Sequence, residues 1–319
     1  MKTNHLWGFK MRLNKYNKAI YALLCLVGVF VSQSMQSDDI TTNLIHNDDL
    51  RLVTDHSQSV DPPLKTKNIS EQKTEARRLV ESKLLKSLDL PDGGGLQIVA
   101  SIGLYQQPAV IRVQILNDNT INGGYMYLKH KKIIKLNGKL NGEFLDLTES
   151  YEGKTTGHLR INPLNPMLSE WLDPLKEYSG SFKVEHMEVM SGDAYAEPVS
   201  IQCFDRYHPI GIINGNDLET VNVTDDMDVL FLDDEKKMFL NIHVVASNAH
   251  MGVFTGLLEM AGLKSYEHRS PDCKINTSLM DDGILTIDEE CRYCCGARAT
   301  LSGSYPLNGV ETYQLSHPK

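Results

Sequence analysis

The sequence predicts a mainly β protein with two antiparallel β domains, each a small barrel or sandwich, and one N-terminal amphipathic helix. From residue 96 onward, apolar and polar residues alternate over short runs, which is the period of a half-buried strand. Pairs such as Asn141-Gly142 and Glu152-Gly153 separate these runs, and Asn-Gly between alternating runs is a strong hairpin signal. The length of 319 residues corresponds to about two domains.

Residues 1–34 have the order of a secretory signal peptide. A basic stretch precedes the apolar run 19–31, and small residues follow at Ser32 and Ser34. We expect cleavage near Ser34. The alternative is an uncleaved anchor, although the 13-residue apolar run is short for a bilayer span. No other segment is apolar enough to span a membrane, so we expect no membrane span after cleavage.

Residues 35–95 predict a linker followed by a helix. The polar segment 35–69 shows no clear period and is typical of an extended linker. A capping pattern then begins at Asn68, and four apolar residues follow at four-residue spacing, which predicts a helix over about 70–88. These residues are Ala76, Val80, Leu84 and Leu88. The segment Pro91-Asp-Gly-Gly-Gly95 ends the helix.

The segment 96–190 predicts a β-meander domain. Seven strands are expected, at 97–105, 109–116, 123–129, 132–137, 143–148, 155–161 and 180–189. Turns are predicted at 117–119, Asn137-Gly138, Asn141-Gly142 and Glu152-Gly153. Consecutive hairpins favour an antiparallel sheet that curls into a barrel or sandwich.

The segment 200–319 predicts a second β domain that contains disulfides. Strand candidates lie at 229–232, 238–245, 251–254, 284–287 and 299–302. The segment Gly256–Gly262 is a candidate for a short helix.

Two parts of the chain resemble known groups of secreted bacterial proteins. The first is similar to an uncharacterised β-meander module, and the resemblance implies a fold more than an activity. It is carried by Ile102-Gly-Leu-Tyr105, Gly124-Tyr-Met-Tyr-Leu-Lys-His130, Ile134-Lys-Leu-Asn-Gly138, Leu145-Asp-Leu-Thr-Glu149 and Trp171-Leu-Asp-Pro174 leading into Phe182. Residues 160–170 lack the Gly-rich hairpin expected of that module.

The C-terminal half resembles the lysozyme-inhibitor-like proteins of Gram-negative bacteria, the LprI-like group. Asn248-Ala-His250 and the ending from Cys295 to Tyr305 carry this resemblance. It implies a periplasmic location and an inhibitory binding role. The chain departs from the group at Met251-Gly252, where a cysteine is expected after the histidine.

Five cysteines follow the predicted signal peptide: Cys203, Cys273, Cys291, Cys294 and Cys295. In an exported protein we expect disulfides, and an odd number leaves one cysteine unpaired or paired between chains. Bonding between adjacent cysteines is strained. This favours Cys291 with Cys295 or Cys294, and Cys273 with the one that remains. Cys203 is then left over. A zinc site would need His250 or His268 as its fourth ligand.

No residue is predicted to be catalytic or to bind a cofactor or metal. His243 and His250 lie seven residues apart, but the chain has no Gly-x-Ser-x-Gly and no His-Glu-x-x-His motif. The acidic pairs, such as Asp281-Asp282, lack the spacing of a calcium loop. Paired carboxylates of the glycosidase kind remain open, because such pairs form only in three dimensions.

The charge of the chain bears on its partners. The net charge is -9, with 32 basic and 41 acidic residues, and five of the basic residues lie in the first 18 positions. Without the signal peptide the net charge is about -14. Such a chain repels nucleic acid and attracts basic proteins.

We therefore predict a periplasmic, non-enzymatic protein that inhibits a basic cell-wall-degrading enzyme. The target is lysozyme or a peptidoglycan hydrolase toxin against which the chain confers immunity. Candidate partner contacts are Asn248, His250, Asp217, Asp225 and Asp226. The alternatives are a hydrolase of envelope polymers and a structural envelope module. An enzyme predicts a cleft with at least one carboxylate of raised pKa. An inhibitor predicts a protruding loop and no such cleft.

Overall fold

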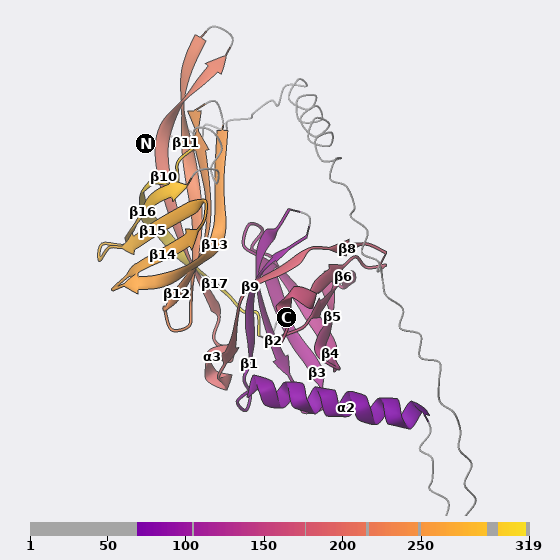
Figure 1. The fold of residues 1–319 in the computed structure, drawn as a ribbon. Coiled ribbons are helices and arrows are strands. Elements are labelled where there is room, and N and C mark those ends of the chain that lie inside the picture. The colour runs from indigo at the N-terminus through magenta and orange to yellow at the C-terminus, as the bar shows by residue number, and fades with distance from the viewer. Residues whose placement is uncertain are drawn as a thin grey trace, which may run out of the picture. The chain divides into compact units, whose positions relative to one another are not determined.

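The computed structural model describes residues 69–103, 105–175, 177–214, 217–247, 250–291 and 299–316. The predicted signal peptide and linker lie outside these residues, as do Asn248, Cys294 and Cys295. The described part contains two antiparallel sheets and one long helix, which confirms the predicted fold class (Figure 1). None of its helices is both long and apolar enough to cross a membrane.

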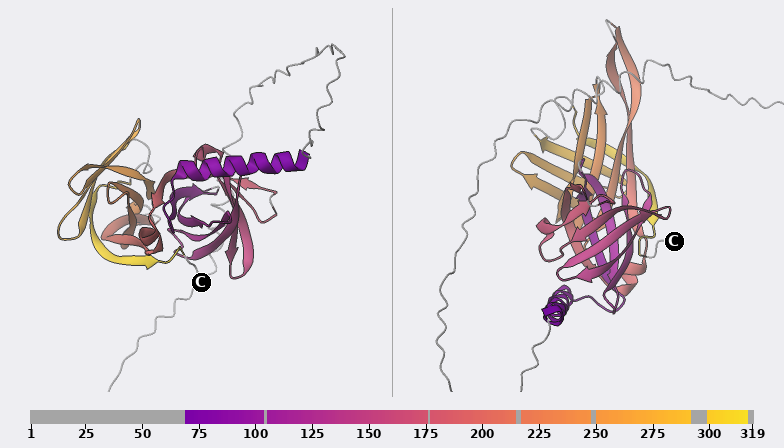
Figure 2. Two further views of the ribbon diagram at one scale, coloured as in Figure 1. Left: turned by 90° about the horizontal axis from the view of Figure 1, so that it is seen from below. Right: turned by 90° about the vertical axis from the view of Figure 1, so that its right-hand side faces the viewer.

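The predicted helix is confirmed as α2, Ile69–Leu88. Its apolar side buries Leu84 and Leu88 in the core of the first sheet. Glu81 is buried as well and accepts hydrogen bonds from Arg77 Nε at 2.7 Å and from Asn119 Nδ2 at 3.1 Å. Asn119 lies in the turn before β3. The helix therefore covers one end of the curved sheet (Figures 1 and 2).

The first sheet is an antiparallel meander with the order β8-β7-β6-β5-β4-β3-β2-β1-β9. Its strands are β1 Gly95–Ile102, β2 Gln107–Ile115, β3 Thr120–Tyr127, β4 Ile133–Asn141, β5 Phe144–Tyr151, β6 Lys154–Ile161, β7 Glu170–Leu172, β8 Ser179–Gly180 and β9 Phe182–Met190. The seven predicted strands are all present. A short 3-10 helix, η1 Pro166–Leu168, lies between β6 and β7, in the segment that lacks a Gly-rich hairpin. The two short strands β7 and β8 then complete this edge of the sheet.

One predicted turn is wrong. Asn137-Gly138 lies inside β4, and the chain turns at Gly142, whose φ is 64°. Gly138 is opposite Leu147, and a Cβ at Gly138 would lie 2.0 Å from the carbonyl oxygen of Asp146. The glycine therefore permits close approach of two strands, a role that sequence spacing does not distinguish from a turn.

The second sheet is a closed eight-stranded barrel that follows the short helix α3, Gly192–Ala196. Its strands are β10 Val199–Asn214, β11 Asp217–Leu232, β12 Lys237–Ala246, β13 His250–Gly262, β14 Ser265–Ser270, β15 Cys273–Leu279, β16 Ile284–Cys291 and β17 Gly303–Tyr313. Strands β10, β14, β15 and β17 were not predicted.

Two predictions for this domain are wrong. The proposed helix at Gly256–Gly262 is part of strand β13, and residues 299–302 precede strand β17 rather than forming a strand. A Cβ at Gly256 would lie 2.8 Å from the ring of Phe254. Gly256 thus makes room for an aromatic side chain within a strand and does not mark a helix end.

A third apolar cluster joins the two sheets. It combines β1, β2 and β3 with the first three barrel strands, and its members include Val99, Val110, Leu230 and Phe239, all at most 3% exposed. Because the inner face of the meander is packed against its own core, these strands are covered on both faces. All eight residues of β1 are buried accordingly.

Candidate protein-binding surface

Strands β10 and β11 extend beyond their neighbours in the barrel. Each has 16 residues, yet β17 pairs with β10 only over Val199–Phe204 and β12 pairs with β11 only over Asp226–Leu232. Segments 207–214 and 217–224 pair only with each other in the described ladders. We call this two-stranded extension the β-ribbon. It projects past the ends of the neighbouring barrel strands (Figure 1).

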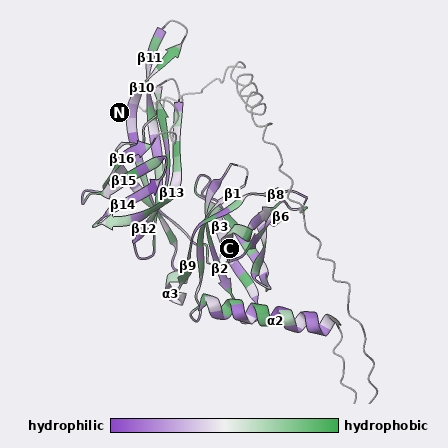
Figure 3. Ribbon diagram, in the orientation of Figure 1, coloured by the Kyte–Doolittle hydropathy of each residue, from purple (hydrophilic) through white to green (hydrophobic). Residues whose placement is uncertain are grey.

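The β-ribbon carries exposed apolar side chains together with acids. Tyr207 is 71% exposed, Ile213 62% and Leu218 74%, and both Asp217 and Glu219 are exposed. Ile210 in the same segment is buried. The sequence from 207 to 224 contains no Lys or Arg, and hydrophobic residues alternate with hydrophilic ones along it (Figure 3). Exposed apolar groups on a projecting element are typical of a protein-binding surface.

The β-ribbon is anchored at its base by a buried ion pair. Asp225 has no exposed surface. Its Oδ2 accepts a hydrogen bond from Arg206 Nε at 2.7 Å and forms an ion pair with Arg206 Nη2 at 2.6 Å. Its Oδ1 accepts from the backbone N–H of Val245 at 2.7 Å. His208 Nε2 lies 3.0 Å from Oδ2 without an aligned hydrogen bond. The predicted partner contact Asp225 is therefore an internal anchor that holds the base of the ribbon.

Arg206 is itself fixed from the other side. Its guanidinium lies 4.7 Å from the centre of the Tyr305 ring, and Nη1 donates to the carbonyl oxygen of Ser302 at 2.8 Å. A Cβ at Gly303 would lie 2.1 Å from Nη1. The Gly-Ser-Tyr ending noted in the sequence thus provides the space and the ring that hold Arg206.

An acidic cleft of about 590 Å³ lies next to the base of the β-ribbon. It is lined by side chains from β10, β11, β12 and β17 and from the segment after β3. The charged and polar ones are Asp205, Asp226, Asp228, Asn241, His243, Asn308, Glu311, Lys129 and Lys131, so acids outnumber lysines by four to two. Met251, 70% exposed, lies at its edge.

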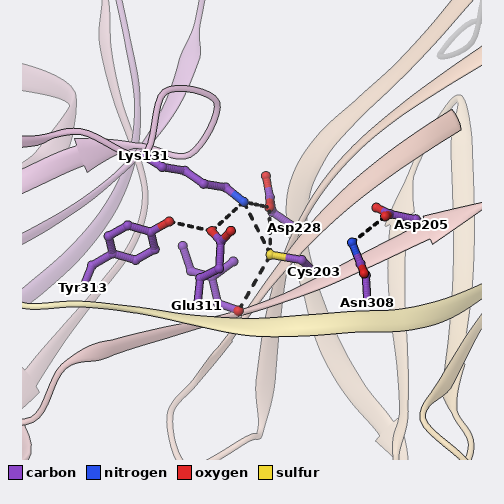
Figure 4. Close-up of polar contacts among 8 residues, drawn as sticks. Lys131, Cys203, Asp205, Asp228, Asn308, Glu311 and Tyr313 are labelled. Atoms are coloured by element: carbon purple, nitrogen blue, oxygen red, sulfur yellow. Dashed lines mark hydrogen bonds and ion pairs between the residues drawn. The ribbon is translucent and has the colours of Figure 1, made fainter. Parts of the chain in front are cut away.

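Lys131 neutralises one end of the acidic cleft. Its Nζ lies 2.7 Å from Glu311 and 3.2 Å from Asp228 (Figure 4). Burial lowers the pKa of Lys131, but the hydrogen bonds to Glu311 and Asp228 have the larger combined effect. The pKa of Lys131 therefore lies above its ordinary value. Cys203 Sγ lies 3.4 Å from the same ammonium, and burial raises the pKa of this thiol. The thiol is therefore mainly protonated and a weak nucleophile at neutral pH.

The other end of the acidic cleft has no such neutralisation. Asp205 accepts a hydrogen bond from Asn308 Nδ2 at 2.6 Å, and neither Asp205 nor Asp226 forms an ion pair with a described Lys or Arg. Desolvation raises the pKa of Asp226; His243 opposes this, and Asp228 and Asp205 reinforce it. A cation placed here would relieve the repulsion among these carboxylates.

The structure places the predicted contacts at separate positions along the barrel strands. Asp217 lies on the β-ribbon and Asp226 lines the acidic cleft, whereas His250 is exposed at the start of β13. Asp205, Asp228, Lys131 and Glu311 were not singled out from the sequence, because they come from separate strands. The run Asp225-Asp226-Met227-Asp228 is the local signal that points to this edge of the barrel.

The predicted cysteine pairing is wrong. Cys273 and Cys291, which are 18 positions apart in the chain, form a disulfide. They lie directly opposite each other on β15 and β16, so strand register selects this pair over the local pairing of Cys291 with Cys294 or Cys295. Cys203 has no disulfide among the described cysteines.

One group of side chains could hold a metal ion. The ligand atoms of His186, Glu188 and Asp233 lie within 4.8 Å of one another. Asp233 already pairs with Lys237 Nζ at 2.9 Å, and Glu188 accepts from Gln97 Nε2 at 2.5 Å and from the N–H of Asp233 at 3.0 Å. Lys237 supplies the positive charge that a metal would bring. We therefore interpret this group as a structural contact between β9 and the β11–β12 turn.

Comparison of the chain with protein-family models, with curated proteins and with solved structures finds no match. Function is therefore inferred from the side chains and the fold.

Proposed function

We propose that this protein binds a basic protein through the β-ribbon and the acidic cleft, and that it inhibits a cell-wall-degrading enzyme in the periplasm. The observation that carries the proposal is the β-ribbon itself. It is a projecting strand pair with three exposed apolar side chains, two acids and no Lys or Arg. This is the protruding element expected of an inhibitor, and lysozyme or a peptidoglycan hydrolase toxin is the proposed target.

Two kinds of contact would hold the partner. Tyr207, Ile213 and Leu218 would enter an apolar groove, where burial of large side chains contributes most of the affinity. A Lys or Arg of the partner would enter the acidic cleft beside Asp205 and Asp226, which form no ion pair with a described Lys or Arg. The net charge of the chain would raise the encounter rate with a basic enzyme.

This account predicts inhibition that depends on salt. We expect the chain to inhibit lysozyme or a purified basic peptidoglycan hydrolase, and the inhibition constant to rise about tenfold or more between low and high ionic strength, because salt screens exposed charges beyond about 10 Å. Asp205→Asn with Asp226→Asn should weaken inhibition and flatten this dependence.

The matched control is Glu143→Gln, an exposed acid on the β4–β5 turn of the meander sheet, which should inhibit like the wild type. Inhibition that does not depend on salt, or an equal loss of inhibition in Glu143→Gln, would show that the acidic cleft does not bind the partner.

Two observations favour a second candidate, a hydrolase of envelope polymers, because Asp226 in the acidic cleft and Glu149 in a cavity of the meander sheet both have a raised pKa. Burial raises the pKa of Glu149 to about 6, although Tyr125 and Trp171 donate hydrogen bonds to it. That value suits a general acid. The cavity that contains Glu149 is lined by no other carboxylate, whereas glycosidases use two. We therefore place this candidate second.

A further inference from the structure

The meander sheet contains a cavity at the end opposite to α2. Strand β3 begins at Thr120, next to the helix-bound Asn119, and ends at Tyr127. The cavity lies at that far end, between the last residues of β3 and β5 and the first residues of β4 and β6, and has a volume of about 330 Å³. This volume is at the lower limit of the volumes of small-molecule binding sites. It lies apart from the β-ribbon, so an inference about it does not rest on the proposed partner.

A buried carboxylate forms part of the cavity wall. Glu149 is 2% exposed. Its Oε1 accepts from Trp171 Nε1 at 2.8 Å and its Oε2 from Thr156 Oγ1 at 3.4 Å. A Cβ at Gly157 would lie 2.7 Å from both Glu149 Oε2 and Trp171 Nε1. The absence of a side chain at Gly157 therefore leaves room for the carboxylate and the indole to meet.

No described Lys or Arg forms an ion pair with Glu149, so the carboxylate is held by neutral donors alone. Desolvation is the largest cause that raises its pKa, to about 6. At neutral pH most of the protein thus keeps an anion in a largely apolar cavity. Burial of an unpaired charge is costly, and a cation that reached Glu149 would offset this cost.

The other walls are aromatic. The rings of Tyr125 and Tyr127 meet edge to face with centres 5.3 Å apart. Lys132 Nζ lies 5.8 Å from the centre of the Tyr151 ring, so one face of the cavity already carries an ammonium group. Aromatic faces and a carboxylate together are the groups that recognise organic cations.

We infer that this cavity binds a small organic cation, with its ammonium group next to Glu149 and its apolar body against the aromatic rings. A purely structural role for Glu149 would explain its hydrogen bonds, but it would not explain why the carboxylate lines a cavity. An anionic ligand would face the buried carboxylate and could pair only with Lys132 or His130.

Three probes of similar shape test the charge requirement: benzylamine, benzyl alcohol and benzoate. The chain contains two tryptophans, so the full chain with Trp7→Phe has Trp171 as its single tryptophan, and its fluorescence reports on the cavity. We expect benzylamine to change this fluorescence saturably and to bind about tenfold or more tightly than benzyl alcohol. Equal binding of amine and alcohol, preference for benzoate, or no saturable change with benzylamine would overturn the inference.

Glu149→Gln keeps the shape of the side chain and removes the charge. It should abolish the preference for benzylamine over benzyl alcohol, whereas Glu143→Gln should retain it. Should Glu149→Gln fail to fold, the pH dependence of the wild type gives the same information. Affinity for benzylamine should fall as the pH drops below about 6, where Glu149 becomes protonated.

His130, Lys132, Tyr125, Tyr127 and Tyr151 are the other titratable groups that line the cavity. Of these, the histidine normally titrates closest to pH 6. The pH measurement is therefore repeated with His130→Gln, which should keep the loss of affinity below pH 6. A benzylamine affinity that does not vary with pH in either protein would contradict the assignment of Glu149 as the partner of the cation.

Discussion

Replacement of Asp225 by alanine is expected to lower the free energy of unfolding by about 3–5 kcal/mol, the cost of removing one partner from a buried ion pair. Asp225 has no exposed surface. It pairs with the Arg206 guanidinium through Nε and Nη2 and accepts a hydrogen bond from the backbone of Val245. Its loss leaves the guanidinium against Tyr305 without a counter-charge. The free energy is measured by urea unfolding.

The matched control is Asp281→Ala. Asp281 pairs with Lys264 Nζ at 2.8 Å, but its side chain is 97% exposed, and exposed pairs contribute little. Its urea midpoint should stay close to that of the wild type. Equal midpoints for the two variants would show that Asp225 does not anchor the β-ribbon.

Removal of the Cys273–Cys291 disulfide should have the second largest effect. The bond closes a loop of 18 residues, and the chain-entropy model gives about 3 kcal/mol for such a loop. We expect the double substitution Cys273→Ala and Cys291→Ala to lower stability by that amount in urea unfolding. Cys203→Ala, which breaks no disulfide with a described cysteine, should cost much less.

The pairing itself is tested by peptide mapping of the oxidised protein. The account predicts a peptide pair that joins Cys273 to Cys291. A peptide that joins Cys291 to Cys294 or Cys295 would contradict it, and the double substitution would then test a different bond.

The strands of the meander could be predicted because their information is local. Each hairpin joins neighbours in the chain, so alternation and turn residues are sufficient to place β1 to β6. Two of the wrong predictions for strands and turns came from glycines. Gly138 and Gly256 resemble turn or helix-end signals, but each is small because another group lies where its Cβ would be. That close contact exists only in the folded chain.

The candidate surface could be predicted only in part. The acids Asp217 and Asp226 are visible in the sequence as part of an acidic segment, but the acidic cleft combines β10, β11 and β17 with Lys131, more than 170 positions away from Glu311. The burial of Asp225 depends on Arg206, which the register of β10 and β11 places opposite it. Glu311 reaches the same edge because β17 pairs with β10 and closes the barrel, and such a long-range pairing has no local signal.

The Glu149 cavity was not predicted, for a similar reason. Glu149 and Trp171 belong to different strands, and the two meet because β6 brings Gly157 between them. A glutamate in an alternating strand is normally solvent-facing. Its position on the inner face, at the same parity as Leu145 and Leu147, is the signal that could have identified it.

The central claim is that the β-ribbon binds a basic cell-wall-degrading enzyme. The most direct test is affinity capture with the immobilised chain from residue 35 onward, exposed to periplasmic and secreted proteins of its source and to lysozyme. The test is run beside the triple variant Tyr207→Ser, Ile213→Ser and Leu218→Ser. A control triple variant replaces Leu164, Met167 and Leu175, which are at least 51% exposed on the meander domain. We predict that the wild type and the control retain one peptidoglycan hydrolase stoichiometrically, and that the ribbon variant does not. Equal retention by all three proteins, or capture of no hydrolase by the wild type, would contradict the claim.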